Sequence, residues 1–178
     1  MANDKWRTPD PVFDSLDREF YFYADMASSD ENAKLERYFT EDDDSLSFDW
    51  AEVLKSSDLA DPTRYVWLNC PYSKPMPWVK QSAKAQQKGL GVVMLLNSDN
   101  SVGWFAEALK TVSEIRYIVA TEKEDGKYSS GRIAFLDEDG SPNSGNDRPQ
   151  VILVFNPFKI GACITSYVKK EDLYKEVS

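Results

Sequence analysis

The chain has 178 residues, of which 42% are hydrophobic and 29% charged, a balance typical of one globular domain that buries a core. It contains no histidine and two cysteines, which excludes serine–histidine and cysteine–histidine nucleophile systems, histidine general bases and a zinc site built from cysteines alone. The formal net charge of −9 argues mildly against a nucleic-acid partner, although residues 74–88 carry four lysines and no acidic residue and leave room for a local basic face.

The first third of the chain predicts two helices and one strand. Asp10 as N-cap, Pro11 at the first helical position and apolar residues at helical spacing predict a helix that reaches Phe20. Residues 20–24 form a short aromatic run that predicts a strand ending at Asp25. The polar stretch 28–44 is expected to be irregular, and residues 46–54 are expected to form a helix with Asp49 as a possible cap.

The middle of the chain alternates between strands and helices. Residues 65–68, 92–96 and 115–119 are apolar runs that predict buried strands. Helices are expected at 78–88, closed by Gly89, and around 104–109. Such alternation predicts a mostly parallel sheet flanked by helices, that is, a three-layer α/β sandwich.

The last third changes character. Residues 133–136 and 151–155 predict two strands joined by a polar stretch without a helix, and therefore a C-terminal antiparallel hairpin. We interpret residues 1–178 as one domain, with a loop at 120–131 and a C-terminal extension at 156–178. The polar first residues and the lack of an apolar run of about 18 residues predict a cytoplasmic protein.

The tetrad Asn69-Cys70-Pro71-Tyr72 follows a predicted buried strand, where ligands bind in open α/β sheets. A side-chain amide oxygen and a nearby peptide carbonyl can each accept one N–H of an exocyclic amino group. Both bonds favour a pyramidal nitrogen whose lone pair can attack a methyl group. An adjacent aromatic ring offers a stacking surface to an extruded base. By itself the tetrad also fits an ordinary structural turn.

The tetrad resembles the (Asp/Asn)-Pro-Pro-(Tyr/Phe/Trp) signature of amino-methyltransferases, and the wider pattern resembles the short phage-type, Dam-like DNA N6-adenine methyltransferase family. The matching stretches, in the family's order, are Trp6-Arg7-Thr8-Pro9 with Phe13 and Leu16; Asp25 with Ala27; Asn32-Ala33-Lys34 and Tyr38-Phe39-Thr40; Asp43-Asp44-Ser45-Leu46 with Asp49-Trp50; Trp67 to Ser73; Trp78-Val79; Met94-Leu95-Leu96 through Asp99 to Trp104-Phe105; and Arg132-Ile133 with Phe135, Gly140, Gly145-Asn146 and Val154-Phe155. Two departures stand out: Cys70 replaces the first proline of the signature, and Asn97 stands where the family usually has proline.

The resemblance implies a class-I, Rossmann-like fold that binds S-adenosyl-L-methionine and no metal. It also implies a phage enzyme that methylates N6 of a flipped-out adenine. The substrate that it implies is double-stranded DNA, in the cytoplasm of a bacterial host. It makes the tetrad catalytic. The cofactor-binding residues that it implies are Trp6, Thr8, Pro9, Asp25, Ala27 and Asp44, although the segment after Asp25 has no Gly-x-Gly turn.

Loops on a rigid scaffold often carry recognition, so the polar insertion 121–131 is a candidate for contacting DNA. The DNA-contacting residues that we expect are Ser73, Lys74, Lys123, Lys127 and Arg132. We expect Trp104 and Phe105 to pack in the core, from their helical spacing to Ala108 and Leu109. The sequence leaves open an N4-cytosine or other amino-group acceptor, and a non-catalytic DNA-binding or DNA-mimic relative.

Overall fold

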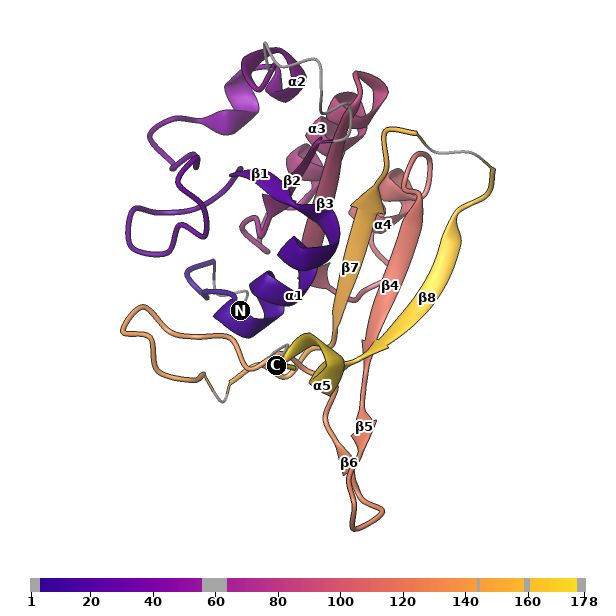
Figure 1. The fold of residues 1–178 in the computed structure, drawn as a ribbon. Coiled ribbons are helices and arrows are strands. Elements are labelled where there is room, and N and C mark those ends of the chain that lie inside the picture. The colour runs from indigo at the N-terminus through magenta and orange to yellow at the C-terminus, as the bar shows by residue number, and fades with distance from the viewer. Residues whose placement is uncertain (1–3, 56–63, 144, 159–160, 176–178) are drawn as a thin grey trace.

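The computed structural model describes residues 4–55, 64–143, 145–158 and 161–175, and within these residues a six-stranded mixed sheet forms the centre of the protein (Figure 1). The helices and strands are α1 (Asp10–Phe20), β1 (Phe22–Asp25), η1 (Ser45–Ser47), α2 (Trp50–Val53), β2 (Arg64–Leu68), α3 (Met76–Gln87), β3 (Leu90–Asn97), α4 (Gly103–Ala108), β4 (Glu114–Val119), β5 (Thr121–Glu122), β6 (Tyr128–Ser129), β7 (Gln150–Phe155), β8 (Ile164–Lys169) and α5 (Lys170–Leu173).

The strands lie in the order β1-β2-β3-β7-β4-β8. Strands β1, β2 and β3 pair in parallel, and β4 pairs in parallel with β8. Strand β7 lies between these two groups and runs antiparallel to both β3 and β4. The carboxyl ends of β1, β2, β3 and β4 therefore meet at one edge of the sheet, and the first residues of β7 lie at that same edge.

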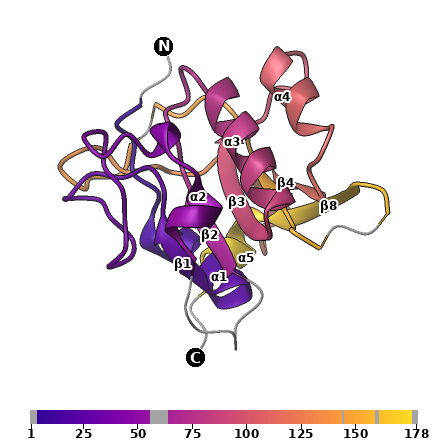
Figure 2. The ribbon, with the colours of Figure 1, turned by 90° about the horizontal axis from the view of Figure 1, so that it is seen from above.

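Helices cover both faces of the sheet (Figure 2). Side chains of β3 alternate between the faces: Val92, Met94 and Leu96 pack with α2, α3 and α4, whereas Val93 and Leu95 pack with α1 and α5. Because both faces are buried, β3 contains only apolar residues and glycine up to Asn97. The predicted three-layer α/β arrangement with a mostly parallel sheet is confirmed.

Most of the predicted elements and their ends are confirmed. Asp49 caps α2 by accepting a hydrogen bond from the Glu52 amide, and Gly89 follows α3 with φ of +90°, where glycine is favoured. One cap was wrong: Pro9 holds the N-cap position of α1 without a side-chain hydrogen bond, and Asp10 is the first helical residue.

The expected C-terminal hairpin was wrong. Residues 133–136 form no strand; Ile133 and Phe135 instead bury their side chains on the α1 face, and Leu136 exchanges backbone hydrogen bonds with Arg7. Every residue of β7 is buried, and a strand that is apolar on both faces is more stable between two neighbours than in a terminal hairpin.

The loop expected at 120–131 lies outside the central sheet, whereas the C-terminal extension expected at 156–178 contributes a strand to it. Residues 120–131 contain the β5–β6 hairpin, which projects beyond the sheet from the carboxyl end of β4 (Figure 1). Residues after 156 contribute β8 to the sheet edge, and α5 packs against α1.

Candidate active site

The tetrad lies in the loop that leaves β2 at the carboxyl edge of the sheet. Asn69 and Tyr72 are half-buried. The Asn69 Oδ1 and the Tyr72 hydroxyl are both buried, and neither has a hydrogen-bond partner among the described residues. A buried polar atom without a partner costs roughly 1–3 kcal/mol, so the pair is suited to a ligand that supplies the missing bonds.

Cys70 stands where the signature has its first proline, and it is buried. Its side chain is 2% exposed and packs in the core, and burial raises the pKa of its thiol well above the usual range. The thiol is therefore protonated and unreactive at neutral pH. The Cys70 carbonyl accepts no backbone hydrogen bond from a described residue, which leaves it available beside Asn69.

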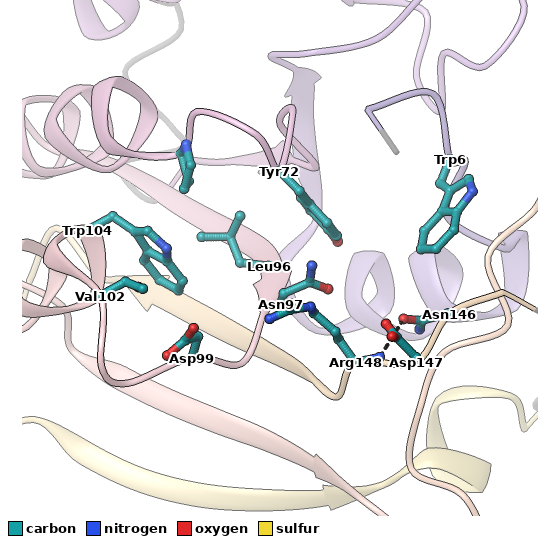
Figure 3. A pocket seen from close by; sticks show the side chains of 11 residues that line it. Trp6, Tyr72, Leu96, Asn97, Asp99, Val102, Trp104, Asn146, Asp147 and Arg148 are labelled. Atoms are coloured by element: carbon teal, nitrogen blue, oxygen red, sulfur yellow. Dashed lines mark hydrogen bonds between the residues drawn. The ribbon is translucent and has the colours of Figure 1, made fainter. Parts of the chain in front are cut away.

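A cavity of about 290 Å³ opens beside Tyr72, and we call it the edge cavity (Figure 3). It lies where β2 and β3 end and β7 begins. Three aromatic rings give this cavity stacking surfaces. Its polar groups are one arginine and four acidic or amide side chains, which belong to the end of β3, to the β3–α4 connection and to the β6–β7 connection. Its lining residues are Trp6, Tyr72, Pro75, Leu96, Asn97, Asp99, Val102, Trp104, Asn146, Asp147 and Arg148.

The N-terminal segment forms one wall of this cavity. The Asp4 carboxylate accepts hydrogen bonds from the Ser73 amide and hydroxyl, at 2.9 and 2.5 Å. Trp6 stacks on Phe135, with ring centroids 5.7 Å apart, and Phe135 meets Tyr72 edge-on at 6.0 Å. The segment is thereby attached to the loop that contains the tetrad, and Trp6 and Tyr72 line the same cavity.

Several polar atoms next to Trp6 also lack partners. The Trp6 Nε1, the Thr8 hydroxyl and the Ser28 hydroxyl are buried without a hydrogen bond among the described residues. Residues 7–10 lie against the loop that contains Ser28, since Arg7 donates to the Glu31 carbonyl at 3.4 Å and Lys34 pairs with Asp10. The segment that contains Thr8 thus lies close to the loop that contains Ser28.

Asp25, the last residue of β1, is 2% exposed. Its carboxylate accepts hydrogen bonds from the amides of Ala27 and Lys34, at 3.2 and 3.4 Å. Burial raises the pKa of Asp25 to about 6, and these two bonds, with the Lys34 charge, limit the rise. The carboxylate holds the turn in which the glycine-rich motif is missing.

The other predicted residues are spread more widely. Pro9 is buried at the start of α1, whereas Asp44 is exposed, has φ of +45° and does not line the edge cavity. Lys74 is exposed beside the tetrad. Lys123 and Lys127 are exposed on the β5–β6 hairpin, away from the tetrad. Arg132 is exposed at the base of that hairpin and donates to the Asp147 carbonyl at 3.4 Å.

The sequence missed part of the cavity wall. Asn97 ends β3 and Asp99 lies two residues further on, and their position at the end of a buried strand was a usable signal. Trp104 was expected in the core, but it lines the cavity while its neighbour Phe105 is buried. Residues 146–148 reach the site because β7 lies beside β3, which no local pattern indicated.

The described residues contain neither a metal-binding cluster nor a membrane-spanning helix. Within the described residues, no cluster of three or more histidine, cysteine or acidic side chains is arranged to hold a metal ion. None of the helices in the described ranges combines the length and the apolar character that are needed to cross a bilayer.

A buried amide oxygen without a partner among the described residues and a tyrosine lie at the carboxyl edge of a mostly parallel sheet, an arrangement typical of an α/β enzyme. A model of the family described as DNA N-6-adenine-methyltransferase (Dam) matches residues 1–177. The chain belongs to this family.

Curated relatives agree with the family match. A DNA N-6-adenine-methyltransferase of Escherichia phage T1 is 35% identical over 166 residues, which cover 90% of this chain and 66% of that protein. A DNA N-6-adenine-methyltransferase of Haemophilus phage HP1 is 30% identical over 175 residues, which cover 96% of this chain and 89% of that protein. The putative methyltransferase YfdM of Escherichia coli (strain K12) is 37% identical over 70 residues, or 37% of this chain and 76% of that protein.

Proposed function

We propose that this protein transfers a methyl group from S-adenosyl-L-methionine to N6 of adenine in double-stranded DNA, in the cytoplasm of a phage-infected bacterium. One observation carries the proposal: the Asn69 Oδ1 is buried with no partner in the described part of the chain, and the adjacent Cys70 carbonyl accepts no backbone hydrogen bond there. Family membership and the two phage relatives support adenine as the acceptor.

In this mechanism the target adenine leaves the duplex and enters the edge cavity, where its ring stacks on Tyr72. Asn69 Oδ1 and the Cys70 carbonyl each accept one N6–H, so the nitrogen becomes pyramidal and presents its lone pair. When bound, the cofactor supplies an electrophilic methyl group for direct transfer. Burial raises the pKa of the Tyr72 phenol, which keeps its hydroxyl neutral beside the base.

The residues at the carboxyl end of β1 fit such a cofactor. The Thr8 and Ser28 hydroxyls and the Trp6 indole N–H are buried without partners and match a ligand with an ammonium group, a carboxylate and ribose hydroxyls. We assign the cofactor to Trp6, Thr8, Pro9, Asp25, Ala27 and Asp44. The parallel β1-β2-β3 core and the ligand position beyond its strand ends support a class-I methyltransferase fold.

DNA would lie across the carboxyl edge of the sheet, with Ser73 and Lys74 near the flipped base. The β5–β6 hairpin, with Lys123 and Lys127, and Arg132 at its base would contact the duplex. Residues 121–132 carry as many basic as acidic residues, whereas the whole chain has a formal charge of −9. The hairpin is thus one of the less repulsive surfaces for phosphates.

The test compares wild type with Asn69→Ala and with Asn100→Ala, an exposed control on the next loop. Unmethylated genomic DNA is incubated with enzyme and cofactor and digested to nucleosides. We expect N6-methyladenine from wild type and the control, and a loss of at least about 100-fold for Asn69→Ala, with unchanged cofactor affinity. If N4-methylcytosine forms instead, the acceptor is cytosine and the proposal of adenine is wrong. If wild type forms no methylated nucleoside, the proposed function is refuted.

A further inference from the structure

Gln150, the first residue of β7, is fully buried at 0% exposure, and its side-chain amide lies within hydrogen-bond distance of five polar groups, three of which are acceptors for the two hydrogens of Nε2. Its Oε1 accepts from the Ile133 amide at 2.9 Å, and a backbone N–H can only donate. Its Nε2 donates to the Arg148 carbonyl at 2.8 Å, and a carbonyl can only accept. Backbone groups therefore fix which end of the Gln150 amide is the donor.

This fixed donor determines the orientation of Asn97, the residue opposite Gln150 in the β3–β7 ladder. The Gln150 Nε2 lies 3.0 Å from the Asn97 side chain, so the atom that faces it must be the acceptor, Oδ1. The Asn97 Nδ2 then points the other way. It donates no hydrogen bond to any described residue, and Asn97 lines the edge cavity, with its side chain between those of Tyr72 and Arg148 in Figure 3.

Backbone groups also fix the orientation of the Asn146 side-chain amide, which lies within hydrogen-bond distance of Gln150. Its Nδ2 donates to the Ile133 carbonyl at 2.8 Å, and its Oδ1 accepts from the Arg148 amide at 3.1 Å. Neither end of the Asn146 amide can exchange roles without losing a backbone bond. Of the two amides on this wall, Asn97 is the one left with a free donor that faces the cavity.

We infer that Asn97 is a specificity-determining residue: its Nδ2 donates a hydrogen bond to a ring nitrogen of the base in the edge cavity, and Gln150 is the positioning residue that prevents the amide from turning over. This inference rests on the proposed function. Asn69 and Cys70 supply acceptors to the amino group, and Asn97 supplies the complementary donor to a ring acceptor. Together they read both hydrogen-bonding characters of one base edge.

Asn97 departs from the usual pattern of the family that the sequence resembles. Proline, the residue that the family usually has at this place, carries no side-chain donor. Asn97 therefore adds a contact that the shared tetrad does not provide, and its removal should weaken base selection without abolishing the chemistry.

The test uses Asn97→Asp and Asn97→Ala in the full chain, with Asn100→Asp as the control for added negative charge in the same loop. In Asn97→Asp the carboxylate still accepts from Gln150, but the cavity loses its donor. In Asn97→Ala the Gln150 Nε2 keeps the Arg148 carbonyl and the Asn146 Oδ1 as acceptors, so the variant should fold. Initial rates of methyl transfer to unmethylated genomic DNA give kcat and KM, and thermal melting and cofactor titration accompany them.

We expect both Asn97 variants to lose roughly 10- to 100-fold in kcat/KM for DNA, the effect of one lost hydrogen bond in a buried site. Their melting temperature and their dissociation constant for the cofactor should match those of wild type, and Asn100→Asp should retain wild-type kcat/KM. Wild-type kcat/KM in both Asn97 variants would overturn the inference. So would a parallel loss of melting temperature and cofactor affinity, since Asn97 would then be structural. Absence of N6-methyladenine from wild type is a different result and would refute the proposed function.

Discussion

Replacement of Tyr72 by phenylalanine removes one oxygen atom that is buried and has no partner among the described residues. Leaving a hydroxyl in that state costs the folded protein roughly 1–3 kcal/mol, and Tyr72→Phe keeps the ring that meets Phe135 at 6.0 Å. Recovery of part of this cost should raise the free energy of unfolding by about 1 kcal/mol, which corresponds to about 2–4 °C in Tm for a chain of this size.

Thermal unfolding followed by circular dichroism, without cofactor or DNA, measures this effect. Tyr38→Phe is the matched control, because the Tyr38 hydroxyl donates to Asp30 at 3.0 Å, and its loss should not stabilise the protein. In the methylation assay Tyr72→Phe should stay active, whereas Tyr72→Ala should lose roughly 1–3 kcal/mol of stacking. If Tyr72→Phe melts below both wild type and Tyr38→Phe, the hydroxyl is satisfied in the free protein and the reasoning is wrong.

Three further predictions concern charge and packing. Burial raises the pKa of Asp25 from 3.8 to about 6, so its ionisation destabilises the folded state as the pH rises between these values. Asp25→Asn should be more stable than wild type by about 3 kcal/mol at pH 8, at about 1.36 kcal/mol per pKa unit, and equally stable below about pH 4 in urea titrations; lower stability at pH 8 would contradict this. Lys123→Ala and Arg132→Ala should each reduce the slope of log K for DNA against log salt by about 1, and an unchanged slope would remove that residue from the interface. Gly91→Ala should cost about 1–3 kcal/mol in urea unfolding, because its Cβ would lie 2.4 Å from the Tyr65 ring; a neutral result would mean that the ring moves freely.

The parts of the fold that the sequence predicted are those with local causes. The α1 helix follows from the spacing of Val12, Phe13 and Leu16, and the position of the tetrad follows from the buried strand before it. The place of β7 could not be predicted, because an all-apolar strand shows that it is buried and not which strands it joins. For the same reason Gln150 and Asn97, which are 53 positions apart, gave no sign that they share a hydrogen bond.

The site shows the same division. Trp6 and the tetrad were predicted, and of these Trp6 and Tyr72 line the edge cavity, whereas Asn146, Asp147 and Arg148 were interpreted as part of a polar connection. Trp104 fits the helical spacing of a core residue, but α4 is a short helix at the rim of the cavity, and its second residue lies on the open side. Periodicity indicates which face of a helix is apolar and not whether a neighbour covers it.

The central position of β7 has a consequence for synthesis on the ribosome. Strands β3 and β4 emerge first, and neither can complete its pairing until residues 150–155 insert between them. A nascent chain that ends before this point exposes two unpaired strand edges, and its edge cavity is incomplete. Methylating activity should therefore arise late in translation, and incomplete products should be inactive and dependent on chaperones.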